Sequence, residues 1–245
     1  MTVDFCLPTG WAELTQKQLK FVYSLIAADY SLDEVKTLAL LKWNGCKVIS
    51  RDNGGFVLQR GKTVFSVKPI QIAEATQSLD WLAELPPYPV RLFRIGRRQA
   101  VAADFQGVPF ESYIIVENLY QGFLTTRNEE MLDEIGAVLY PGVKHLSAAE
   151  RINVFYWVAS LKQMLARQFP DFFQPMPESG GNLLGGSPNI GAQLQECMDA
   201  QIRALTKGDI TKESEILSLD TWRALTELNA QAREYRQINS KYNAK

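Results

Sequence analysis

The sequence predicts an α+β fold, with a mostly helical body, a small antiparallel sheet of hairpins and a C-terminal helical arm. Three observations support this prediction. Apolar residues have helical spacing at the start of the chain, the spacing becomes strand-like after Cys46, and a Pro- and Gly-rich stretch precedes the last helical residues. We therefore divide the 245 residues into a mixed α+β body (1–173), a flexible linker (174–189) and a helical arm (190–245).

Capping boxes mark the first two helices. Thr15 with Gln18, and Ser31 with Glu34, each place a hydroxyl at the N-cap and a side chain three residues later that reaches back to the free backbone amide. The apolar residues that follow recur every three or four positions. They are Leu19, Val22, Tyr23 and Ile26 in the first helix, and Val35, Leu38 and Ala39 in the second.

Three short strands and a further helix come next. The stretches KVIS, FVLQ and TVFSV are rich in β-branched and aromatic residues, and turn sequences at 52–55 and 60–62 separate them. We expect these stretches to form antiparallel hairpins. A helix is expected over 71–85, stopped by Pro86 and Pro87, and then a second strand pair, 90–95 with 100–105, joined through 96–98.

The middle and the end of the chain return to helical spacing. We expect a helix over 110–126, a helix capped by Asn128, and a long buried helix that a third capping box, Ser147 with Glu150, opens and that ends near Gln168. In the arm we expect two helices, 190–206 and 211–242, divided at residues 207–209.

Composition excludes several classes of protein. The chain has 26 basic and 27 acidic residues, so no overall charge attracts it to nucleic acid or to an anionic membrane. Cys6, Cys46 and Cys197 are odd in number and widely spaced, which fits a reducing cytoplasmic location better than a disulfide framework. The N-terminus lacks the features of an export signal, and no stretch is apolar for long enough to span a membrane.

Reactive side chains are few. His145 is the only histidine and lies in a predicted connection, and the glycine pairs of the linker lack the lysine of a phosphate loop. The densest group of acids fits a solvated helix face: Glu129, Glu130, Asp133 and Glu134. We therefore expect no enzyme, and we assign no catalytic residue, metal site or cofactor.

A basic cluster is the first candidate binding feature. Arg91, Arg94, Arg97 and Arg98 fall within eight residues, and no acid occurs from Pro86 to Ala103. The preferred interpretation is pairing with acids of this same chain. Two alternatives are an acidic protein partner and the phosphates of a nucleic acid, and neutral net charge disfavours the second.

The apolar stripe of the arm is the second candidate. Trp222, Leu225, Leu228 and Tyr235 recur at helical spacing opposite a polar face. Such a stripe packs on its own body, pairs with a second copy of the chain, or docks in a groove of another protein. In each case Trp222 is the expected anchor, because an indole buries a large apolar area.

Two stretches resemble a known group of proteins. They are LPTGWAELTQKQL (7–19) and ALTKGDITKESEILSLDTWRALTELNAQARE (204–234). Both resemble uncharacterised proteins encoded in bacterial prophages, among genes for virion and tail parts. The resemblance implies a tail-assembly or accessory virion role, with phage structural subunits as partners, in the host cytoplasm or in the virion. It assigns no catalytic residue.

The expected function is therefore that of a non-enzymatic interaction or assembly protein that docks through its C-terminal amphipathic helix. On this hypothesis, deletion of residues 190–245 leaves a folded body that no longer binds its partner. The alternative is a nucleic-acid-associated protein of a mobile element that uses the Arg-rich hairpin.

Overall fold

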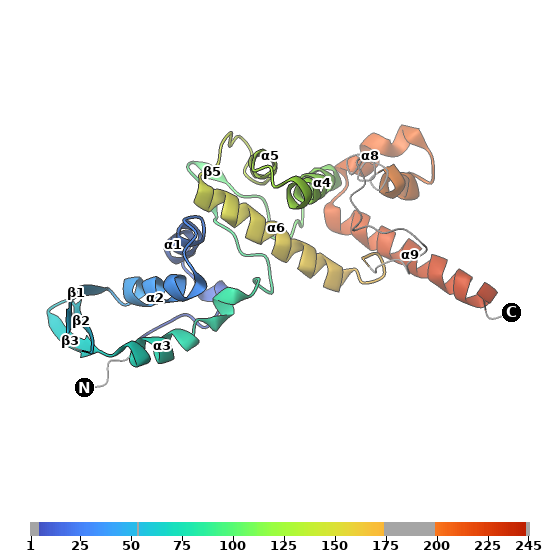
Figure 1. Ribbon diagram of the computed structural model, residues 1–245. Helices are drawn as coiled ribbons and strands as arrows, with labels where there is room; N and C mark the ends of the chain where they lie inside the picture. The colour runs from blue at the N-terminus through green and yellow to red at the C-terminus, as the bar shows by residue number, and fades with distance from the viewer. Residues whose placement is uncertain (1–4, 53, 174–198, 244–245) are drawn as a thin grey trace. The chain divides into compact units, whose positions relative to one another are not determined.

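The computed structural model describes residues 5–52, 54–173 and 199–243 (Figure 1). The predicted α+β class is confirmed: helices predominate, with one three-stranded antiparallel sheet, one two-stranded sheet and a helical C-terminal region. The chain forms two compact units. Of the described residues, the first unit contains those up to 86, 90–93 and 146–156, and the second contains 87–89, 94–145 and those from 157 onward.

The first unit begins with a 3₁₀ turn, η1 (Trp11–Glu13), and two helices, α1 (Gln16–Ile26) and α2 (Leu32–Trp43). Both predicted capping boxes are confirmed. Gln18 Oε1 accepts a hydrogen bond from the Thr15 amide at 2.9 Å, and Glu34 Oε2 accepts one from the Ser31 amide at 2.8 Å. These bonds satisfy amides that a helix start otherwise leaves unpaired.

The predicted hairpins form a sheet of β1 (Cys46–Asp52), β2 (Gly55–Arg60) and β3 (Thr63–Val67), with β2 in the centre (Figure 1). Leu58 lies opposite Val48 on one side and Phe65 on the other, so the three side chains share one face of the sheet. A small core includes Leu58 together with Leu40 of α2 and Ile72 of α3 (Pro69–Gln77).

The helix predicted over 71–85 is shorter than expected. It begins earlier, at Pro69, because proline is well suited to the first helical position, and α3 ends at Gln77. The Ser78 hydroxyl donates a hydrogen bond to the Ala75 carbonyl at 2.8 Å, which competes with continued backbone pairing. A separate 3₁₀ turn, η2 (Asp80–Ala83), follows.

An aromatic cluster forms the larger core of the first unit. The ring centroid of Trp11 lies 6.1 Å from that of Tyr23, 5.4 Å from that of Trp81 and 5.6 Å from that of Tyr156.

The predicted strand at 90–95 is wrong in its first four residues. The Leu92 amide donates to the buried Asn153 Oδ1 at 2.8 Å, so a side chain takes the place of a strand partner.

Gly55 allows a close approach between β2 and β3. A Cβ atom at this position would lie 2.4 Å from the Val67 carbonyl oxygen, which is a backbone atom and cannot rotate away. We expect Gly55→Ala to lower the free energy of unfolding by about 2 kcal/mol, because the strands must separate locally. Chemical denaturation measures the change. Gly54→Ala is the matched control, since no atom lies within 4 Å of its Cβ position, and equal stability of the two variants would contradict the close packing.

The second unit contains the hairpin β4 (Arg94–Ile95) and β5 (Arg98–Gln99), then α4 (Phe110–Thr126) and α5 (Glu130–Leu139). Of the predicted strand pair, only 94–95 forms a strand where it was expected. Its partner is 98–99, which precedes the predicted 100–105, and 100–105 is not a strand. The Val101 amide instead donates to the Leu139 carbonyl at 2.9 Å, which ties this segment to the end of α5. The bounds of α4 match the prediction.

The helix α6 (Ala148–Gln168) follows, and its residues are divided between the two units. The start of α6 is as predicted, with the Ser147 amide donating to Glu150 Oε2 at 2.9 Å. At the start of α5, Asn128 Oδ1 accepts from the Glu130 amide at 3.0 Å, although the N-cap position itself is Glu129.

The C-terminal region has more elements than predicted. A helix over 199–206 is followed by η3 (Ile210–Lys212), α8 (Glu213–Ser218) and α9 (Thr221–Asn243). The prediction of a continuous helix over 211–242 is thus wrong. Asp220 caps the start of α9 by accepting from the Arg223 amide at 3.1 Å, and the Leu219 carbonyl pairs with the Phe110 amide. The predicted linker and residues 190–198 lie outside the described residues.

Among the helices that the structure describes, none has the length and apolar character required to cross a bilayer.

Candidate interaction surfaces

The first half of α9 packs within the second unit. Trp222 Nε1 donates to the Asp104 carbonyl at 2.6 Å, and the Trp222 ring lies 5.4 Å from the ring of Phe169. Leu225 and Leu228 are 0% and 4% exposed. The prediction that these three residues face a partner needs correction, because their own unit covers Leu225 and Leu228 and binds the Trp222 indole.

An ion-pair cluster holds the middle of α9. Asp171 pairs with Arg233 Nε at 2.8 Å and with Arg236 Nη2 at 2.8 Å. The hydrogen bond from Arg233 keeps the pKa of Asp171 below its ordinary value, and the charges of both arginines act in the same direction. One turn earlier, Asn229 Oδ1 accepts from the Phe172 amide at 3.0 Å.

The second half of α9 is exposed. Tyr235 and Ile238 are 68% and 53% exposed, and their spacing of three residues places them on the same helix face. Tyr235 is the one residue of the predicted docking set that stays largely accessible. The apolar stripe predicted from sequence therefore has two parts, an inner part covered by the second unit and an outer part formed by Tyr235 and Ile238.

The structure does not gather the four arginines on one face. Arg91 belongs to the first unit, where its guanidinium lies 5.8 Å from the ring centroid of Phe93. In the β4–β5 hairpin, Arg98 lies opposite the buried Ile95, so these two share a face, and Arg94 lies on the other. Nucleic-acid binding through a single arginine face is not supported by this arrangement.

Arg97 is at the tip of the hairpin. Gly96 and Arg97 form a two-residue turn in which Gly96 has φ of +56°, a conformation that glycine adopts without strain. The side chains of Arg94, Arg97 and Arg98 are exposed, and none forms an ion pair with an acid among the described residues. The expected pairing within the chain is therefore not seen for these three arginines in the part of the chain that the structure describes.

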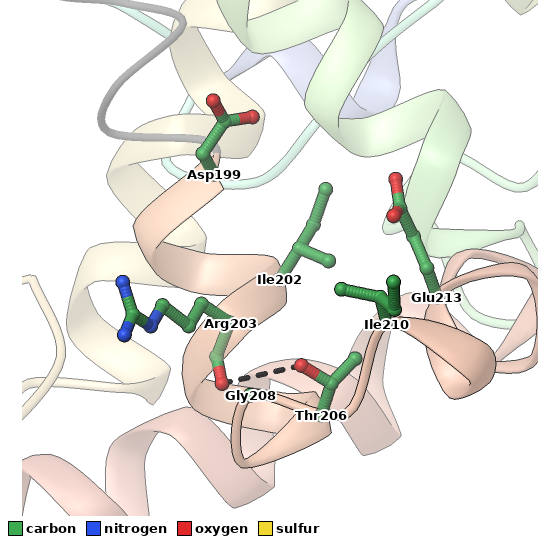
Figure 2. A pocket seen from close by; sticks show the side chains of 7 residues that line it. All are labelled: Asp199, Ile202, Arg203, Thr206, Gly208, Ile210 and Glu213. Carbon is green, nitrogen blue, oxygen red and sulfur yellow. Dashed lines mark hydrogen bonds between the residues drawn. The ribbon is translucent and has the colours of Figure 1, made fainter.

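A small pocket near the C-terminal end was missed from sequence (Figure 2). Its volume is about 310 Å³, and its lining comes from the helix over 199–206 and from the turn and helix that follow. The lining residues are Asp199, Ile202, Arg203, Thr206, Gly208, Ile210 and Glu213. Figure 2 shows Ile202 and Ile210 directed toward each other across the pocket.

Backbone geometry at the end of the helix creates the pocket. Lys207 and Gly208 both have positive φ, and the Gly208 amide donates to the Arg203 carbonyl at 3.1 Å, the long bond of a Schellman motif. The chain turns back there, which brings Ile210 over Ile202. In the sequence the Lys207–Gly208 pair is the local signal of this turn, and by itself it predicts only a division between two helices.

The remaining reactive groups are dispersed. Within the described part of the chain, no three His, Cys, Asp or Glu side chains converge as metal ligands. His145 is exposed in a connection, Cys6 is exposed and Cys46 is buried. Burial raises the pKa of the Cys46 thiol, against the opposing charge of Arg60, and burial, with the charge of Glu117 adding to it, raises the pKa of Tyr120 to about 12.

Taken together, these features define an α+β protein whose second unit presents an exposed helix end, a basic hairpin tip and a small pocket. Comparisons with known protein families, with curated proteins and with solved structures found no match to this chain.

Proposed function

We propose that this protein is a non-enzymatic interaction and assembly protein of a phage-like particle, and that it docks a protein subunit through the outer half of α9. The exposed pair Tyr235 and Ile238 carries this proposal. The resemblance of 7–19 and 204–234 to prophage proteins supplies the class of partner, a structural subunit, and the setting, the host cytoplasm or the virion.

The packing of α9 suits it to docking. Its inner half is fixed to the second unit by Trp222, Leu225 and Leu228. The ion pairs of Asp171 fix the helix again at a point adjacent to the exposed residues. An exposed segment that continues from a fixed helix loses little conformational freedom on binding. Its apolar face fits a groove of a partner in the helix-in-groove mode.

The test replaces both exposed residues in the full chain. We expect Tyr235→Gln with Ile238→Gln to weaken partner binding at least about tenfold, because both apolar anchors of the surface are removed. Partners are captured from the native cell, identified by mass spectrometry and then titrated with the purified variants. The fold should be unchanged, since both side chains are mostly exposed.

The matched control is Ile70→Gln, which removes an apolar side chain that is also exposed but lies on α3 of the first unit. We expect it to bind as the wild type does. If the α9 variant captures the same partners with the same affinity, docking through α9 is wrong.

A further inference from the structure

We propose that the protein also associates with itself head to tail, with Arg97 of one copy inserted into the pocket of a second copy. This inference rests on the proposed assembly function and deepens it, because it names a second copy of the chain as one partner. Two different surfaces of the same unit take part, the β4–β5 hairpin and the pocket shown in Figure 2.

The hairpin supplies a projecting cation. Arg97 occupies the second position of a two-residue turn, which places it at the extreme end of the hairpin, and no acid of the described residues pairs with it. Ile95 is buried and the Arg98 guanidinium lies against the backbone of Gly142, so the base of the hairpin is fixed to its unit. The turn therefore presents Arg97 from a rigid support.

The pocket has the chemistry that an arginine side chain requires. Ile202 and Ile210 give the pocket an apolar lining, and Ile210 is 83% exposed, so an incoming arginine can lay its aliphatic stem against them. Figure 2 shows the Glu213 side chain beside this apolar pair and the Arg203 side chain directed away from it. Glu213 is exposed and can accept a guanidinium hydrogen bond.

The volume agrees with a side chain as the occupant. A pocket of about 310 Å³ lies at the lower end of the range for small-molecule sites, and such a pocket accepts one projecting side chain. Negative Glu213 and positive Arg97 are complementary, whereas a nucleic acid would meet like charge at the pocket.

A second copy is the occupant that the chain itself offers. Arg97 is not among the residues that line the pocket of its own molecule. The hairpin segment is bonded to α5, while α8, which carries Glu213, packs on α4. Because the donor and acceptor surfaces differ, the contact is heterologous, and it generates an open chain of subunits or a closed ring.

Charge reversal in the full chain tests the contact. Arg97→Glu and Glu213→Arg are each prepared, with Lys17→Glu, an exposed residue of α1, as a control for the change in net charge. Sedimentation velocity over a range of concentrations measures self-association. We expect the wild type and the control variant to self-associate. Each charge reversal should weaken self-association at least about tenfold, and an equimolar mixture of the two charge-reversed variants should associate again.

Restoration in the mixture is the decisive result, because each hairpin of one variant then meets a pocket of opposite charge on the other variant. A wild type that stays monomeric at all concentrations overturns the proposal. Self-association that is unchanged in both charge-reversed variants also overturns it. An equimolar mixture of the two variants that does not self-associate overturns it as well. A fluorescent DNA duplex is titrated in parallel, and loss of DNA binding by Arg97→Glu with self-association unchanged would assign the hairpin to phosphate recognition instead.

The two proposals can fail separately. The Tyr235 and Ile238 double variant leaves the hairpin and pocket intact, so it should self-associate normally while it loses its other partner. The charge-reversed variants keep the outer half of α9 and should still capture that partner.

Discussion

A chain that ends at Phe173 is expected to lose the fold of its second unit. This result is the opposite of the sequence-based hypothesis, in which removal of the arm leaves a folded body. The inner half of α9 buries Leu225 and Leu228 and positions Trp222 against Phe169. Each large apolar side chain stabilises the fold by about 1.5–3 kcal/mol when buried, so the loss is comparable to the whole stability of a domain, about 5–15 kcal/mol.

Backbone groups are also left without partners by this truncation. The Phe110 amide loses the Leu219 carbonyl, and the Val108 carbonyl loses both the amide and the hydroxyl of Thr221, the latter at 2.7 Å. Each buried polar group without a partner costs about 1–3 kcal/mol. The isolated β-bridge between Pro109 and Asp220 disappears with them.

Calorimetry and near-ultraviolet circular dichroism measure this effect. We expect the truncated chain to lose the heat of one unfolding transition. The matched control ends at Arg236, which retains the Asp171 ion pairs and removes only the residues from 237 onward. Equal unfolding of the full chain and the chain that ends at Phe173 would show that α9 is not part of the core.

Trp157→Ala is expected to be the most destabilising of the single substitutions considered. Trp157 is 0% exposed, its ring meets Tyr140 edge to face at 5.7 Å, and its Nε1 donates to the Ala103 carbonyl at 2.8 Å. The cavity and the lost contacts should lower the free energy of unfolding by about 3–5 kcal/mol. The unfolding temperature should fall by roughly 10 °C for a chain of this size.

Trp157→Phe separates the two contributions of the indole. It keeps an aromatic ring and removes the donor, so the loss of the hydrogen bond to the partly buried Ala103 carbonyl should cost about 1 kcal/mol. Phe93→Ala is the control, because Phe93 is mostly exposed and should change stability by less than about 1 kcal/mol. If Trp157→Ala and Phe93→Ala melt at the same temperature, the burial of Trp157 is contradicted.

Two tryptophan side chains, one from each of two helices, donate hydrogen bonds to the same segment of backbone. Trp157 of α6 donates to the Ala103 carbonyl, and Trp222 of α9 donates to the Asp104 carbonyl. The next residue, Phe105, is buried with φ of +64°, a backbone conformation that is unfavourable for a bulky side chain. The surrounding contacts must stabilise it, which explains why both tryptophans are expected to matter for stability.

The structure agrees with the sequence-based prediction where the interactions are local. The capping boxes at Thr15 and Ser31 require only residues three positions apart, and the three strands from Cys46 to Val67 follow from alternation and turn residues. The break at Asp220, which the predicted continuous helix lacks, also has a local signal in the sequence, an N-cap residue followed by threonine and tryptophan.

Non-local outcomes were not available from the sequence. The stripe of Trp222, Leu225, Leu228 and Tyr235 is uniform in sequence, but the tertiary structure covers its inner part and leaves Tyr235 exposed. Likewise, no spacing rule says that Arg94 and Arg98 lie on opposite faces, because the register of the two-residue hairpin sets their directions. The pocket requires two segments to meet across a turn.

By itself, the sequence determined the α+β class, the caps and strands near the N-terminus, the helices at 110–126 and 148–168, and the amphipathic character of the C-terminal helix. The tertiary structure alone decided which part of that helix belongs to the core, where each arginine points and where a pocket forms. The physical reason is the range of the interactions. Caps, turns and periodicity act between neighbours in sequence, whereas burial and charge pairing depend on which distant segments come into contact.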